Sequence, residues 1–146
     1  MDLKELYQEI ILDHGKSPRN FGKCKNFTSD AKGHNPLCGD KVHIYAELDN
    51  NKKIIDLSFE GEGCAISLAS ASILTDTLKG KDLNVANSII ENFLKLIKEN
   101  KLITVNSLND NQKTTLMSLS GVKDFPMRVK CATMAWHTLS SVLEKK

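Results

Sequence analysis

Three cysteines and one aspartate stand in short segments whose residue types favour metal binding. Cys38 and Asp40 share the segment Asn-Pro-Leu-Cys-Gly-Asp, Cys64 ends Gly-Glu-Gly-Cys, and Cys131 ends Arg-Val-Lys-Cys. Glycines beside the first three give the backbone the freedom that converging side chains need. Thiolate sulfur and carboxylate oxygen are both ligands of tetrahedral zinc. The four side chains therefore predict one metal site, provided that the fold brings them together.

The local positions of Cys64 and Cys131 bear on their reactivity. Cys64 is expected at the start of a helix, where the positive end of the helix dipole lowers a thiol pKa. Arg128 precedes Cys131 by one helical turn, so its guanidinium could favour the Cys131 thiolate or reach an approaching partner. Ligation requires deprotonated thiols, so metal binding here would depend on pH. Taken alone, Cys131 on an apolar stripe would be an ordinary small core residue.

Two alternating segments supply the geometry that brings Cys64 to Cys38 and Asp40. Apolar and polar side chains alternate over residues 42–48 and again over 54–59, with turn residues between them. This pattern predicts a β-hairpin. Its strands are of similar length, so Asp40 and Gly61 should meet at the open end. A short edge strand is expected over residues 28–32.

Periodic apolar residues and helix-terminating signals predict five helices that frame this hairpin. The last helix carries Cys131 on its inward stripe. The expected helices cover residues 2–14, residues 65 to the stop at Gly80, residues from the cap Asp82 to 97, residues 112–119, and residues from 124–126 onward.

The remaining histidines and the fourth cysteine are assigned no chemistry. His14 and Arg19 are interpreted as a solvated helix end and a loop ion pair. His43 lies on the polar face of its strand and is expected to be solvated. His137 is rotated about 120° around the last helix from its cysteine, which makes it a poor ligand for the same metal. Cys24 is expected to be a free thiol.

Composition excludes several classes of function. The 146 residues hold 20 basic and 18 acidic side chains, for a formal net charge of +2. The lysines are spread along the sequence, which disfavours binding to nucleic acid or to an anionic membrane. No stretch approaches the roughly 20 apolar residues of a membrane span, and the charged start differs from a signal peptide. Four cysteines without an export signal favour metal or catalytic thiols in the cytoplasm. The length predicts a single domain over residues 1–146.

The three cysteine segments, in this order, resemble those of the NifU-like iron–sulfur cluster assembly family, which includes the IscU and SufU branches. The Ala-Ile-Ser run after Cys64 and the segments 13–14 and 18–20 extend the resemblance. Lys130 stands where the IscU-type scaffold has a histidine before the last cysteine. The segment between the second and third cysteines, around residues 100–121, is longer, as in SufU. The sequence is therefore identified as a member of the SufU branch.

The resemblance implies an α+β domain with a small antiparallel sheet of three strands, helices on one side, and zinc held by Cys38, Asp40, Cys64 and Cys131. It also implies a sulfurtransferase-like role as acceptor of persulfide sulfur from a pyridoxal-phosphate cysteine desulfurase of the SufS type. A desulfurase histidine would take over one zinc position and free Cys38 to attack the persulfide. Arg128 is the expected contact with this partner, and a downstream iron–sulfur assembly scaffold is the expected recipient.

Three other functions compete with sulfur transfer. The same ligands could assemble an iron–sulfur cluster that is then passed to apo-proteins. A closed tetrahedral site could instead be structural zinc, which can contribute on the order of 10 kcal/mol to folding. A thiol hydrolase would need a histidine beside its cysteine, and neither His43 nor His137 is placed for that role.

Overall fold

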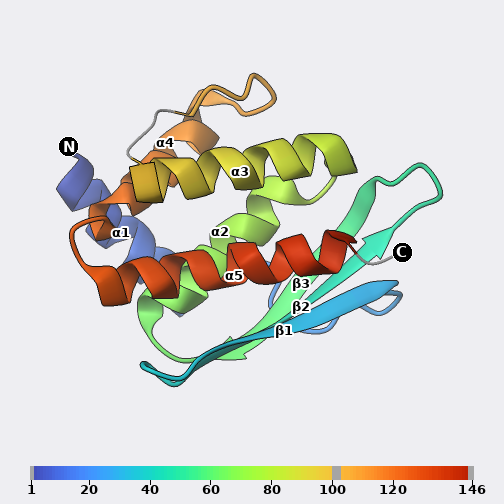
Figure 1. Ribbon diagram of the computed structural model, residues 1–146, viewed down its shortest axis with the longest axis horizontal. Coiled ribbons are helices and arrows are strands. Elements are labelled where there is room, and N and C mark those ends of the chain that lie inside the picture. Colours follow the sequence, from blue (N-terminus) through green and yellow to red (C-terminus); the bar gives the residue numbers. More distant parts are fainter. Residues whose placement is uncertain (1, 100–102, 145–146) are drawn as a thin grey trace.

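The computed structural model describes residues 2–99 and 103–144, which form a small sheet with helices on one side (Figure 1). The strands β1 (Ser29–Asn35), β2 (Asp40–Leu48) and β3 (Ile54–Glu62) make one antiparallel sheet in the order β1-β2-β3. The helices are α1 (Leu3–Lys16), α2 (Ala65–Leu78), α3 (Leu83–Glu99), α4 (Asp110–Ser118) and α5 (Pro126–Glu144), with a 3-10 turn η1 (Leu119–Val122) after α4. The expected α+β architecture of three strands and five helices is confirmed.

The predicted hairpin is formed by β2 and β3. Its register runs from Leu48 opposite Ile54 to Lys41 opposite Glu62. At the tip, the Asp49 carboxylate accepts hydrogen bonds from two backbone amides of the turn, each at 2.9 Å. These bonds fix the turn and therefore the register. As a result, the residues that flank the open end of the hairpin lie side by side.

A second hairpin joins β1 to β2, and the sequence did not indicate it. The edge strand was expected over residues 28–32, but it runs on to Asn35, which pairs with Asp40 across a four-residue turn. The strand is polar, so it lacks the alternation that would reveal its length. Gly33 explains its position, because a Cβ atom there would collide with the Thr138 hydroxyl of α5. Close packing on α5 thus holds β1 in place.

The helix termini follow the expected signals. The Asp82 carboxylate accepts the Val85 amide at 2.9 Å, so the predicted cap of α3 is confirmed. Gly80 follows α2 with φ +87°, a conformation suited to glycine. Asn109 forms a capping box that starts α4 two residues before the predicted position. None of the described helices is long and apolar enough to cross a membrane.

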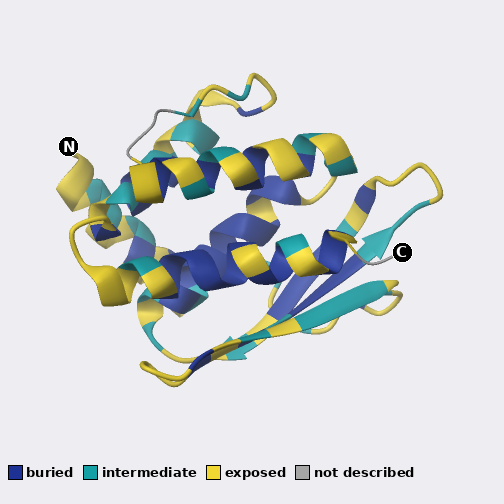
Figure 2. Cartoon of the chain, viewed as in Figure 1, coloured by how far each residue is buried: buried dark blue, intermediate teal, exposed yellow. Residues whose placement is uncertain are grey.

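The core lies between the inner face of the sheet and the helices α2 and α5. Figure 2 shows α2 buried along most of its length in the middle of the molecule. Its Ala and Ser residues let α1 and α5 pack closely against it, as the sequence suggested. The Trp136 indole of α5 stacks on Phe93 of α3 at 4.0 Å between ring centroids and donates a hydrogen bond to Ser70 of α2 at 2.9 Å. This packing fixes α5 and its cysteine relative to the sheet.

Candidate metal centre

The four predicted ligands converge at the open end of the β2–β3 hairpin. Cys38 lies in the turn before β2, Asp40 is the first residue of β2, Cys64 caps α2, and Cys131 lies near the start of α5. The ligand atoms of Cys38, Asp40 and Cys131 are all within 4.8 Å of one another. Cys64 lies against this group, with its Sγ 3.6 Å from Asp40 Oδ2. The fold therefore brings together all four residues that the sequence singled out.

The sulfur spacing suits a tetrahedral metal. Cys38 Sγ and Cys131 Sγ are 3.6 Å apart, and both thiols are free. A disulfide would require about 2.05 Å. Two sulfur atoms bound at about 2.3 Å to one tetrahedral zinc lie about 3.8 Å apart. The observed distance is therefore close to the one that a shared zinc ion requires.

Asp40 gives a second reason to expect a cation. Its side chain is fully buried, at 0% exposure, and Oδ1 accepts the Cys64 amide at 2.8 Å. Within residues 2–99 and 103–144, no lysine or arginine pairs with this carboxylate. A buried carboxylate without a cationic partner is costly. A divalent ion ligated by Asp40 and the adjacent thiols would supply the missing charge, so the residues present fit zinc.

The three thiols of this centre differ in their exposure to solvent. Cys38 is exposed, Cys64 is half-buried and Cys131 is buried. Burial raises the pKa of the Cys131 thiol above its ordinary value, and hydrogen bonds with Asp40, Cys64 and Cys38 raise it further. A bound metal acts in the opposite direction, because it favours the thiolate. Cys38 is consequently the thiol that an approaching molecule can reach.

Cys64 is held by the first turn of α2, as expected. Its Sγ accepts the Ser67 amide at 3.4 Å, so the thiol caps the helix. The preceding Gly63 has φ +135°, and a Cβ atom there would collide with the Asp40 side chain. The glycine at this position therefore serves the close approach of the two ligand segments as well as backbone freedom.

Asn35 belongs to the centre, although the sequence assigned it no role. It is buried, and its amide Nδ2 lies 3.8 Å from Cys131 Sγ. Its backbone carbonyl accepts the Cys38 amide and its Oδ1 accepts the Leu37 amide, both at 3.3 Å. Asn35 thus shapes the turn that presents Cys38. Its turn-forming residue type directly before Pro36 was the available signal.

Arg128 is exposed in the first turn of α5, on the side that faces α1. Its guanidinium stacks over the Phe125 ring, with 4.4 Å from Cζ to the ring centroid. It also bonds to Tyr7, whose pKa is raised by burial and partly lowered again by this arginine. Tyr7 is a further residue that the sequence did not connect to the site. Smaller contributions from the charges of ionised Cys64 and Cys131 also raise its pKa.

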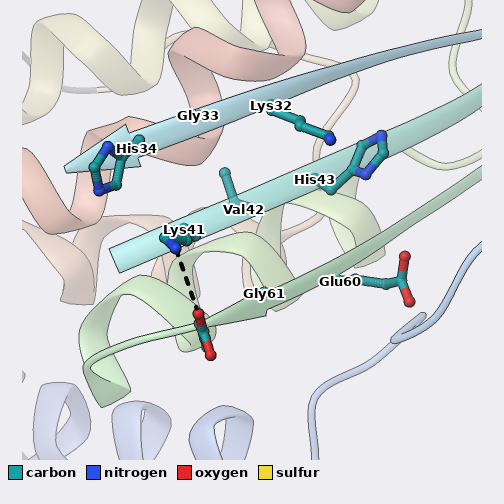
Figure 3. Close-up of a pocket in the computed structure, with 9 residues that line it drawn as sticks. Lys32, Gly33, His34, Lys41, Val42, His43, Glu60 and Gly61 are labelled. Carbon is teal, nitrogen blue, oxygen red and sulfur yellow. Dashed lines mark ion pairs between the residues drawn. The ribbon is translucent and has the colours of Figure 1, made fainter. Parts of the chain in front are cut away.

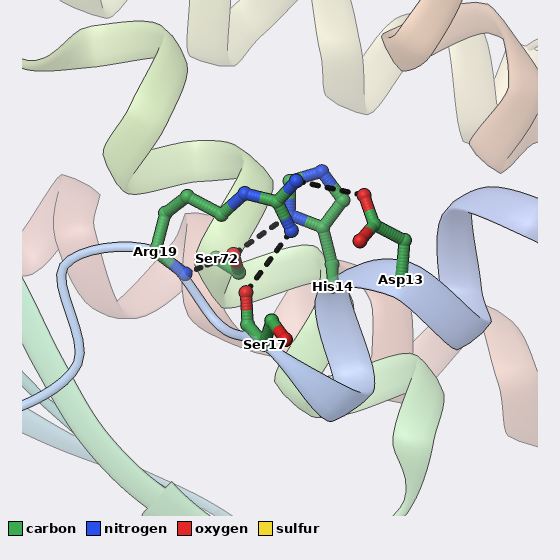
Figure 4. Close-up of polar contacts among 5 residues, drawn as sticks. All are labelled: Asp13, His14, Ser17, Arg19 and Ser72. Atoms are coloured by element: carbon green, nitrogen blue, oxygen red, sulfur yellow. Dashed lines mark hydrogen bonds and ion pairs between the residues drawn. The ribbon is translucent and has the colours of Figure 1, made fainter.

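The interpretation of His14 as a solvated helix end is wrong. His14 is buried at 8% exposure, and its Nδ1 lies 2.7 Å from the Ser72 hydroxyl (Figure 4). The small residues of α2 let the end of α1 dock there, so the imidazole is covered. The predicted ion pair of Arg19 is confirmed: its guanidinium contacts Asp13 at 2.7 Å. The Arg19 backbone amide also donates to Ser72 at 2.8 Å, which ties the loop to α2.

The other residues left without chemistry lie outside the metal cluster. His43 is on the polar outer face of the sheet (Figure 3), as predicted, but it is half-buried and bonded to Asp30 at 2.6 Å and to Tyr45 at 2.9 Å. The imidazole of His43 therefore bonds to these two side chains where hydrogen bonds to water were expected. His137 is exposed on α5. Cys24 is a free thiol, as predicted, and is buried.

Comparison with known proteins agrees with this arrangement. The model of the family described as the NifU-like N terminal domain matches residues 6–132. The zinc-dependent sulfurtransferase SufU of Bacillus subtilis is 38% identical over 99% of this chain and 94% of its own. The iron-sulfur cluster assembly scaffold protein IscU of Streptococcus pyogenes is 32% identical over 98% and 86% of the two chains. A crystal structure titled as a putative iron-sulfur cluster assembly scaffold protein for the SUF system, from Fervidobacterium islandicum, superposes with a TM-score of 0.81 at 34% identity, covering 96% of this chain and 98% of that one. The chain belongs to the family of NifU-like N-terminal domains.

Proposed function

We propose that this protein takes part in iron–sulfur cluster assembly by accepting persulfide sulfur from a cysteine desulfurase, with Cys38 as the acceptor. The observation that carries the proposal is an exposed thiol at the edge of a cluster of metal-ligating side chains, 3.6 Å from the buried Cys131 thiol. The similarity to a zinc-dependent sulfurtransferase over nearly the whole chain supports it. The free thiols also favour the cytoplasm as the site of action.

The proposed zinc ligands are Cys38, Asp40, Cys64 and Cys131. Zinc, when bound, would keep the thiols deprotonated at neutral pH. Asp40 and Cys131 are buried, and Cys64 is fixed as the cap of α2. Cys38 is held only by a short turn at the surface, so it is the ligand best able to leave. Gly39, with φ +70°, gives that turn a conformation that most residues resist.

Sulfur transfer then requires an attack by Cys38. Its thiolate attacks the outer sulfur of the donor persulfide, the donor sulfur–sulfur bond breaks, and the donor cysteine leaves as a thiolate. Cys38 then carries the transferred sulfur as a persulfide. A histidine from a pyridoxal-phosphate desulfurase of the SufS type would occupy the vacated ligand position. Arg128, exposed beside the centre, would contact that partner, and an iron–sulfur assembly scaffold would receive the sulfur.

A pair of cysteine variants tests this function. With a cysteine desulfurase and free cysteine, the unaltered protein should gain the mass of one sulfur atom on Cys38 and should stimulate release of alanine. Cys38→Ala should lose both effects. Cys24→Ala should retain both, because that thiol is buried outside the cluster. Normal stimulation by Cys38→Ala would overturn the assignment.

A second candidate function is a scaffold on which an iron–sulfur cluster is assembled, and the similarity to the Streptococcus pyogenes scaffold favours it. Metal analysis of protein purified without oxygen separates the two functions. One zinc per chain and no visible absorbance would support sulfur acceptance. Iron and sulfide with visible absorbance, and transfer of the intact cluster to an apo-protein, would support the scaffold.

A further inference from the structure

A broad groove opens beside the metal centre, along one side of α5. It has a volume of about 880 Å³ and lies between the end of β1, the end of α3 and the first turns of α5. We call it the basic groove, because none of the described residues that line it is acidic. Its basic lining residues are His34, Lys98, Lys123, Lys130 and His137.

This concentration of positive charge is produced by the fold. In the sequence the basic residues are scattered among nearly as many acidic ones, 20 against 18. The three lysines of the groove come from separate parts of the chain: Lys98 from α3, Lys123 from the segment before α5, and Lys130 from α5. Partial burial and the neighbouring Lys98 charge both lower the pKa of His137, which favours its neutral form, so the positive charge of the groove is assigned to its lysines. An anionic partner would complement this charge.

Apolar side chains form the rest of the groove and limit the kind of anion that fits. Among them are Leu37, which is 61% exposed, and the more deeply placed Ile97, Val129 and Met134. A free inorganic anion would leave this apolar surface in water. None of the described residues that line it is a phenylalanine, tyrosine or tryptophan, which disfavours a nucleic-acid strand whose bases stack on such rings. An extended peptide can place carboxylates on the rim and apolar side chains on the floor.

We propose that the basic groove binds an acidic, partly apolar peptide segment of the desulfurase that delivers sulfur to Cys38. Leu37 and Pro36 line the groove, and Cys38 follows them directly in the chain. A segment seated in the groove would therefore hold its parent protein next to the acceptor thiol. The inference rests on the proposed function for the identity of the partner, and the peptide binding itself is independent of sulfur chemistry.

Fluorescence polarisation with a labelled peptide of alternating glutamate and leucine residues tests the groove directly. The zinc-loaded protein should bind this peptide, and added salt should weaken the binding. Lys98→Glu and Lys130→Glu should each weaken it about tenfold. Lys25→Glu is the matched control, since that exposed lysine lies in the loop before β1 and outside the groove. Its affinity should equal that of the unaltered protein.

Two outcomes would refute the assignment of the basic groove as a site for an acidic, partly apolar peptide. One is no binding of the labelled peptide, and the other is equal affinity for a peptide in which serine replaces leucine. The first variant, Lys98→Glu, should also raise the KM of the desulfurase for this protein and leave kcat unchanged, because the acceptor site is intact. An unchanged KM would refute the assignment of the segment to the desulfurase. If the protein accepts sulfur but does not bind the peptide, only the groove proposal is refuted. If it binds the peptide but does not accept sulfur, only the proposed function is refuted.

Discussion

Substitution of Gly63 by alanine should disrupt the metal centre more than its small size suggests. Gly63 joins β3 to the Cys64 cap of α2 and has φ +135°. A Cβ atom at this position would lie 2.8 Å from Asp40 Cα and 2.9 Å from Asp40 Cγ. Asp40 is fully buried and paired in β2, so it has little room to move. The added methyl group must therefore separate two of the proposed ligand segments.

Two costs contribute to the expected loss of stability. A side-chain-bearing residue held in this backbone region costs about 1–3 kcal/mol. Overpacking against Asp40 adds about 1–3 kcal/mol. Gly22→Ala is a matched control for the first cost, since Gly22 has φ +123° and nothing within 4 Å of an added Cβ. We expect Gly22→Ala to lower the free energy of unfolding by about 1–3 kcal/mol and Gly63→Ala by about 2–6 kcal/mol.

Urea unfolding of the metal-free proteins measures these free energies, and competition with a chelator measures zinc affinity. Gly63→Ala should bind zinc about tenfold to a hundredfold more weakly, because Asp40 and Cys64 are displaced. Gly22→Ala should bind zinc as tightly as the unaltered protein. If the two variants lost the same stability and the same affinity, the contact between Gly63 and Asp40 would not limit the site, and the reasoning would be refuted.

Three further predictions follow from buried polar groups and thiol exposure. Burial, with a smaller contribution from Arg19, lowers the pKa of His14, so the unfolded chain binds a proton more readily. The stability that His14 contributes should therefore be lost as pH falls below about 6.5, and urea unfolding of metal-free His14→Gln should show a weaker decline between neutral and mildly acidic pH. Ser70→Ala should lower the free energy of unfolding by about 1–3 kcal/mol, since it leaves the Trp136 N–H without its acceptor, whereas Ser141→Ala at the surface should change little. Iodoacetamide should label Cys38 before the buried cysteines in metal-free protein, as followed by peptide mass spectrometry, and equal labelling of all four would contradict the exposure described here.

Local patterns were sufficient to predict most of the helices and the β2–β3 hairpin. Strict alternation fixes which residues of a half-buried strand face the core, and the hairpin then brings its two ends together. That single geometric step placed Cys64 beside Asp40. The capping residue Asp82 acts within one turn of its own helix, so its neighbours in sequence revealed it, whereas the capping role of Asn109 was not predicted.

Features that depend on tertiary packing were harder to predict. The strand β1 has no apolar alternation, and its pairing depends on β2 and on the approach of α5 to Gly33. The prediction that His14 is solvated was wrong, because a polar residue type at a helix end is not sufficient to indicate exposure. His14 lies three and four residues after Ile11 and Ile10, on the stripe that docks α1, and that spacing was the available signal. The lysines of the basic groove come from separate parts of the chain, so no short stretch of sequence shows them together.

The distribution of the proposed ligands suggests how one site can be both stable and reactive. Asp40 belongs to the sheet, Cys64 to the start of α2 and Cys131 to α5, so these ligands join the elements that enclose the core. A metal bound by them would stabilise the fold, because the unfolded chain does not hold these groups together. Cys38 lies in a surface turn instead, so its departure would disturb little of that packing. The fold thus separates the ligands that secure the metal from the one proposed to carry sulfur.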